Sequence, residues 1–129
     1  MGTLHEQLDA MLALPENWDG YGADSILPSA VATAKDFVSF FEAIERANGQ
    51  TLQLIVGPTR IGGVQVEWQD HREDHELEVM PDGSLSILHF DRVEGRTREE
   101  QFAPPTERAV AARGLIPRMA EWTAFAGAR

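Results

Sequence analysis

The chain has 129 residues, 43% of them hydrophobic and 25% charged, which suits one domain with a buried core and excludes wholesale disorder. It contains no cysteine, which excludes disulfides, thiolate chemistry and zinc sites built on thiolates. Its net charge of −10 is concentrated in the first two-thirds, with −6 over residues 1–59, −6 over residues 60–91 and +2 over residues 92–129, and this distribution disfavours nucleic acid as a partner.

The sequence pattern predicts neither a membrane span nor a secretory leader. The apolar stretches are a few residues long, whereas a membrane span needs about 18 residues or more. Residues 1–6 contain no basic region followed by an apolar run. We therefore expect a single domain over residues 1–129, located in the cytoplasm and without a membrane partner.

A short helix is expected near the N-terminus. Thr3 and Glu6 match a capping box, in which each side chain bonds the amide of the other residue. Apolar residues then recur at helical spacing: Leu4, Leu8, Met11 and Leu12. This pattern predicts a helix over about residues 4–14 that ends near Pro15.

A longer helix is predicted over about residues 28–47. It starts at Ser25 or Ser29, with Pro28 accepted in its first turn. A wide apolar stripe follows at steps of three and four, made of Ala30, Ala34, Phe37, Phe41 and Ile44 with Val31 and Val38 alongside. The pair Asn48–Gly49 is typical of the left-handed cap that ends such a helix.

In the middle of the chain the apolar residues recur at a period of two, which predicts strands with one buried face. The alternating sets are Leu52, Leu54 and Val56; Val64, Val66 and Trp68; Leu77 and Val79; and Leu85, Ile87 and His89. Short turns at residues 57–63, 70–74 and 81–84 join these strands into an antiparallel meander. A fifth strand is expected at residues 96–102, after a turn at Glu94–Gly95.

The end of the chain is expected to be helical again. Pro104–Pro105 ends the sheet, a helix runs over residues 106–113, Gly114 breaks it and Pro117 restarts it. The predicted fold is therefore α+β, with two N-terminal helices, an antiparallel β-meander of four to five strands and a broken C-terminal helix. The helices are expected to cover one face of the sheet and to leave the other face solvated.

The loop between the first two helices is the most distinctive segment. Residues 17–23 read Asn-Trp-Asp-Gly-Tyr-Gly-Ala, in which Asn17 or Asp19 can close an Asx turn and the two glycines permit positive φ. Its aromatic residues, Trp18 and Tyr21, have two alternative roles. They either cap the core with their polar tips hydrogen-bonded, or they anchor a partner or ligand.

Several motifs together carry a resemblance. They are residues 17–23 (Asn-Trp-Asp-Gly-Tyr-Gly-Ala), Pro28, Phe40–Phe41, residues 62–68 (Gly-Gly-Val-Gln-Val-Glu-Trp), residues 77–79 (Leu-Glu-Val) and residues 81–84 (Pro-Asp-Gly-Ser). Over about residues 12–90 this combination resembles a family of small uncharacterised proteins from bacteria and phages. The resemblance supports the fold boundaries and implies a bacterial or phage origin, but it implies no activity and no catalytic residue.

The sequence favours neither a metal site nor an enzyme. His71 and His75 share a face only on a helix, whereas they flank a predicted hairpin turn, so we expect no metal and no other cofactor. Glu67, Glu76 and Glu78 are expected on the open sheet face, without a His or Lys placed to assist acid–base chemistry. No Gly-x-Ser-x-Gly motif is present.

We therefore expect a non-enzymatic protein-interaction module that acts through an acidic surface, of the antitoxin, immunity-protein or phage-encoded inhibitor type. The alternative is a small-molecule-binding protein or minor enzyme with a site between the Trp18–Tyr21 loop and the sheet. The candidate partner- or ligand-binding residues are Trp18, Asp19, Tyr21, Glu67 and Glu78. A homodimer that pairs sheet edges, or exposed apolar residues such as Leu88 and Phe90, is a third hypothesis.

Overall fold

The computed structural model of the chain describes residues 3–49 and 53–102. Helices precede a five-stranded antiparallel sheet, so the predicted α+β class is confirmed. The elements in order are α1 (Leu4–Ala10), the 3₁₀ turn η1 (Met11–Ala13), α2 (Pro28–Asn48), β1 (Ile55–Pro58), β2 (Val64–Gln69), β3 (Glu73–Val79), β4 (Leu85–Asp91) and β5 (Arg96–Phe102). The broken C-terminal helix that the sequence predicts at residues 106–113 and beyond lies outside the described residues.

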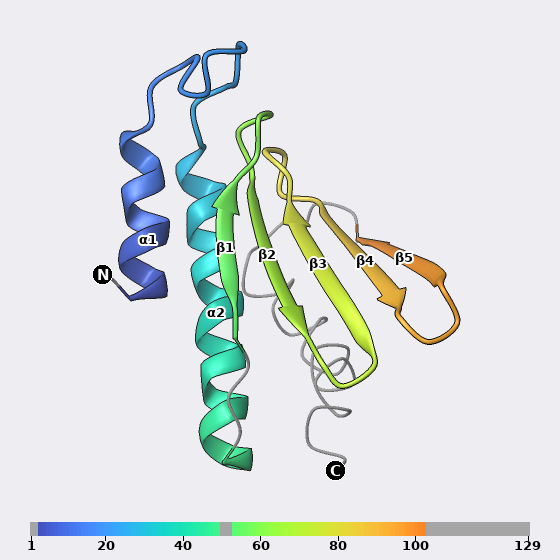
Figure 1. Ribbon diagram of the computed structural model, residues 1–129. Coiled ribbons are helices and arrows are strands. Elements are labelled where there is room, and N and C mark those ends of the chain that lie inside the picture. The colour runs from blue at the N-terminus through green and yellow to red at the C-terminus, as the bar shows by residue number, and fades with distance from the viewer. Residues whose placement is uncertain (1–2, 50–52, 103–129) are drawn as a thin grey trace.

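The sheet is a simple meander in which each strand pairs with the next strand of the chain, in the order β1-β2-β3-β4-β5. Both helices lie on one face of this sheet, with α1 beside α2 and in contact with β1 (Figure 1). We call the helix-covered side the inner face and the opposite side the outer face. This one-sided arrangement is the one that the period-two alternation predicts.

The predicted boundaries of α2 are confirmed to within a residue, but its start is built differently. Pro28 occupies the first turn, and the N-cap residue is Leu27, whose side chain makes no capping hydrogen bond. The Leu27 N–H donates instead to the carbonyl of Gly62, 3.0 Å away, so the turn between β1 and β2 fixes the start of the helix. Gly49 ends the helix with φ of 65°, as its left-handed cap requires.

The first helix keeps its predicted start and changes character near its end. Thr3 and Glu6 form the reciprocal capping box, with both hydrogen bonds at 3.1 Å. After Ala10 the chain tightens into η1, where Leu14 N–H donates to the carbonyl of Met11. The segment predicted as one helix over residues 4–14 is therefore an α-helix followed by a 3₁₀ turn.

The hydrophobic core lies between the helices and the inner face of the sheet. Its buried members are Leu8, Met11, Ile26, Ala30, Val31, Ala34, Phe37, Val38, Phe41, Leu54, Val64, Val66, Trp68, Leu77, Val79, Leu85 and Ile87. The Trp68 ring lies 4.7 Å from the ring of Phe41, which joins β2 to α2. Burial of a large apolar side chain of this kind contributes roughly 1.5–3 kcal/mol.

Toward one end of the sheet the inner face changes from apolar to polar. Trp68 of β2 lies opposite His75 of β3, which in turn lies opposite His89 of β4. Both histidines are buried, and so is Glu73, the next inward-facing residue of β3. The sheet therefore carries a buried polar cluster beside its hydrophobic core.

Candidate functional site

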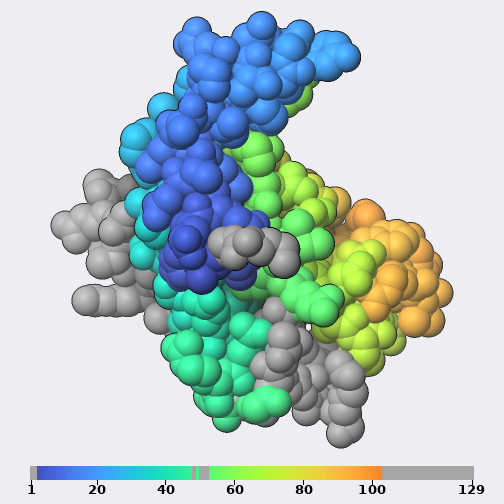
Figure 2. Space-filling model, turned by 60° about the vertical axis from the view of Figure 1, so that its left-hand side comes forward, coloured from blue at the N-terminus to red at the C-terminus, as the bar shows by residue number. Residues whose placement is uncertain are grey.

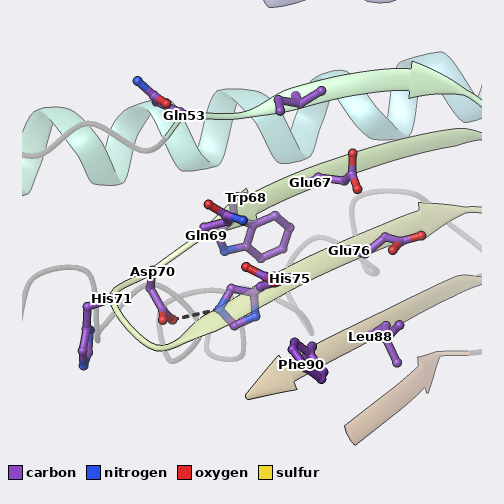
Figure 3. A pocket seen from close by; sticks show the side chains of 12 residues that line it. Gln53, Glu67, Trp68, Gln69, Asp70, His71, His75, Glu76, Leu88 and Phe90 are labelled. Atoms are coloured by element: carbon purple, nitrogen blue, oxygen red, sulfur yellow. Dashed lines mark hydrogen bonds and ion pairs between the residues drawn. The ribbon is translucent and has the colours of Figure 1, made fainter. Parts of the chain in front are cut away.

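The outer face of the sheet carries an acidic row. Glu67 of β2 and Glu76 of β3 are direct cross-strand partners, and Ile55 of β1 and Leu88 of β4 lie on either side of them in the same row. Because cross-strand partners share a face, these four side chains all lie on the side away from α2. Figure 3 looks onto this surface with the helix behind the sheet.

Exposed apolar side chains lie beside the carboxylates. Leu88 and Phe90 are each 37% exposed, and Ile55 is 63% exposed. Together with Glu67 and Glu76 they line an open depression of about 680 Å³ in the outer face (Figure 3). Acidic and apolar groups are therefore available on the same concave surface.

The electrostatics of the row are unfavourable in the free protein. Partial burial and the neighbouring carboxylates of Glu67 and Glu78 raise the pKa of Glu76 above its ordinary value of 4.5. Like charges directly opposite each other across a sheet are destabilising. A cationic group placed between the glutamates would relieve both effects.

Two of the five residues singled out from the sequence belong to this face. Glu67 lines the depression, and Glu78 lies next to it, opposite Gln65 and Ser86. The structure does not bring Trp18, Asp19 and Tyr21 into this depression.

The Trp18–Tyr21 loop is held together by its own hydrogen bonds. The indole N–H of Trp18 donates to the carbonyl of Asp24, 2.9 Å away. Asp19 Oδ1 accepts from the amides of Tyr21 at 2.8 Å and Ala23 at 3.2 Å. The hydrogen bond from the Tyr21 amide is the main cause that lowers the pKa of Asp19. Burial opposes it, and the Ala23 amide and the Arg60 side chain lower the pKa further. The indole N–H of Trp18 and Oδ1 of Asp19 are thus used inside the loop.

The same loop is attached to the turn between β1 and β2. Arg60 Nε donates to Asp19 Oδ2 at 2.7 Å, and the Asp24 amide donates to the carbonyl of Arg60 at 2.8 Å. The loop projects at one end of the molecule (Figure 2), and Tyr21 in it is 82% exposed. Of the aromatic pair, Trp18 is therefore tied into the loop, whereas Tyr21 presents its ring to solvent.

The buried polar cluster at the turn between β2 and β3 is a second site. The sequence analysis considered His71 and His75 of this segment together and did not foresee that His75 lies with Asp70 and Glu73. Asp70 Oδ2 lies 2.8 Å from His75 Nε2, and His75 Nδ1 lies 2.7 Å from His89 Nδ1. His89 Nε2 in turn lies 2.9 Å from Glu100 Oε2. A continuous hydrogen-bonded chain therefore runs from the turn across three strands to β5.

The turn itself positions the first carboxylate of that chain. Asp70 Oδ1 accepts from the amides of Arg72 at 2.8 Å and Glu73 at 2.6 Å, which closes the turn. Burial tends to raise the pKa of Asp70, but the hydrogen bonds from His75 and from these two amides lower it below its ordinary value. Asp70 is thus held ionised beside an imidazole.

Glu73 joins the cluster from the start of β3. Its two carboxylate oxygens accept from the Arg98 guanidinium of β5 at 2.9 and 3.3 Å. Donor atoms of Asp70, Glu73 and His75 lie within 4.8 Å of one another, and all three residues are buried. His71, in contrast, is exposed in the turn and points away from His75 (Figure 3). His75 therefore lies beside Asp70 and Glu73, and not beside His71, with which the sequence analysis had paired it.

Comparison with protein-family models, with curated proteins and with solved structures finds no match for this chain. Within residues 3–49 and 53–102, no helix combines the length and the apolar character needed to cross a membrane.

Proposed function

We propose that this protein is a non-enzymatic binding module that holds a basic, partly apolar segment of a partner protein on the outer face of its sheet. The observation that carries the proposal is the direct opposition of Glu67 and Glu76 on neighbouring strands. This repulsion costs stability in the free protein. An Arg or Lys side chain of a partner placed between the two carboxylates would remove it, so the same feature favours binding.

The apolar residues of the face support the same proposal. Leu88, Phe90 and Ile55 flank the carboxylates and offer apolar contact area on the same surface. The proposed partner therefore combines basic residues with apolar residues. A second copy of this chain fits less well, because stacking two such faces would bring like charges together.

The proposal has consequences for the setting of the protein. A small acidic chain that neutralises a basic partner corresponds to an antitoxin, an immunity protein or a phage-encoded inhibitor, in a bacterium or phage. We place this binding in the cytoplasm, because a chain without cysteine needs no oxidising compartment. Tyr21 offers a further contact at the end of the molecule, since its side chain is exposed.

The test uses a short synthetic peptide of alternating Arg and Leu as the probe, with a peptide of alternating Gln and Leu as its control. Amide and side-chain NMR shifts are recorded on the full chain as peptide is added. We expect shifts at Glu67, Glu76, Leu88 and Phe90, and weaker binding at high salt. Shifts confined to the helices would refute the proposal.

Two matched triple variants distinguish the effect of the acids on the outer face from the effect of the net charge of the chain. The first replaces the acids of the face, Glu67→Gln, Glu76→Gln and Glu78→Gln. The second replaces the same number of acids elsewhere, Glu16→Gln, Asp36→Asn and Glu45→Gln. We expect the first to lower the affinity for the Arg–Leu peptide about tenfold, at roughly 0.5 kcal/mol per exposed pair, and the second to leave it nearly unchanged. Equal losses in both would show that only the net charge of the chain matters.

A further inference from the structure

We propose that Asp70, Glu73 and His75 bind one divalent transition-metal ion, such as Zn²⁺, at the turn between β2 and β3. Their donor atoms lie within 4.8 Å of one another and all three side chains are buried. One imidazole with two carboxylates and no thiolate suits Zn²⁺, Co²⁺ or Mn²⁺ better than soft cations. This site is separate from the acidic row and does not depend on the proposed function.

The hydrogen bonds already made by the carboxylates leave lone pairs that could ligate a metal ion. Each carboxylate oxygen has two lone pairs, so Glu73 can accept from Arg98 and ligate an ion as well. Asp70 uses Oδ1 for the backbone amides of the turn, which leaves Oδ2 facing His75. The turn therefore aims one oxygen of Asp70 at the place where the ion would lie.

The far side of His75 is arranged as it is in metal-binding histidines. Such a histidine almost always has its second ring nitrogen hydrogen-bonded to a group that fixes the ring. Here Nδ1 of His75 bonds His89, and His89 is itself bonded to Glu100. This support is an observation independent of the donor cluster, and it orients Nε2 of His75 toward Asp70.

An ion bound to Nε2 of His75 would replace the hydrogen bond to Asp70. The hydrogen bonds between His75 and His89 and between His89 and Glu100 would stay in place.

Titration of the full chain with Zn²⁺ and with Co²⁺ tests the proposal, by calorimetry and by the visible absorption of bound Co²⁺. We expect one ion per chain and a raised Tm with either metal. Glu73→Gln should weaken binding about 100-fold, whereas the matched surface variant His71→Asn should leave the affinity unchanged. Circular dichroism verifies that both variants are folded.

The outcomes are decisive in either direction. Absence of one-to-one binding to the wild-type chain overturns the proposal, and so does binding that survives Glu73→Gln but is lost in His71→Asn. If Glu73→Gln does not fold, imidazole ¹⁵N resonances of the wild-type chain decide the question. A Zn²⁺-induced shift at His75 and His89 supports the site, and a shift at His71 or His5 alone refutes it.

Discussion

Replacing Glu76 by Gln is expected to stabilise the free protein, although the change removes a charged side chain from its surface. Glu76 lies directly opposite Glu67, and cross-strand partners have Cβ atoms about 5 Å apart. For two carboxylates about 6 Å apart in water the repulsion is about 0.7 kcal/mol. Physiological salt roughly halves this value, so we expect a gain of about 0.3 kcal/mol at 0.15 M salt and about 0.7 kcal/mol at low salt.

The pH dependence of this gain follows from the pKa of Glu76, which is raised from 4.5. Because the folded chain binds that proton more tightly than the unfolded chain, the repulsion is fully present above the raised pKa. It disappears as the pH falls below the ordinary value, where both states are protonated. The advantage of Glu76→Gln should therefore be present at pH 7 and lost at about pH 4.

Urea denaturation at two salt concentrations measures the effect. Glu99→Gln is the matched control, because Glu99 is a glutamate whose direct partner on β4 is Leu88. A cycle with Glu67→Gln adds a second check, since removing either glutamate relieves the same repulsion and the two gains should not add. Equal effects of Glu76→Gln and Glu99→Gln, or full additivity in the cycle, would show that the row stores no repulsion.

Two further predictions concern the fold. The hydrogen bond from the Arg72 side chain lowers the pKa of Asp91 from 3.8 to about 2. The ionised Asp91 therefore contributes stability above pH 3.8, and this contribution is lost as the pH falls toward 2. Asp91→Asn should flatten the acid side of a stability–pH curve measured with urea. At Gly63, an added Cβ would lie 2.2 Å from the carbonyl oxygen of Val79, so Gly63→Ala should cost about 1–3 kcal/mol in thermal or urea unfolding. Gly57→Ala is its control, because a Cβ there meets no atom within 4 Å, and an equal loss in both variants would contradict the steric explanation.

The fold was largely predictable because local patterns decide it. The apolar stripe and Gly49 define α2, and the period of two with short turns defines the meander, including the fifth strand at Arg96–Phe102. The start of α2 was not predictable in detail. The Leu27 amide is hydrogen-bonded to the Gly62 carbonyl, which lies far from it in the sequence, and no local capping motif predicts such a bond.

The acidic face was predictable in composition but not in pairing. Alternation places Glu67 and Glu76 on the same face, yet only the register of β2 with β3 sets them opposite each other. The buried cluster was missed because the sequence analysis considered His71 and His75 as the possible metal-binding pair. It did not consider Asp70 and Glu73 as partners of His75. The better indication was the presence of polar residues, Glu73 and His75 among them, at inward positions of a period-two strand.

The two edge strands of the described sheet disfavour self-association by strand pairing. The outermost strands are β1, which has four residues and ends in Pro58, and β5, whose Arg98 and Glu99 are exposed. Short length, proline and charge on edge strands all oppose the addition of another strand and the growth of fibrils. Strand addition at either edge of the described sheet is therefore disfavoured. A partner protein is more readily accommodated on the outer face, where it can contact Leu88 and Phe90 without pairing with an edge strand.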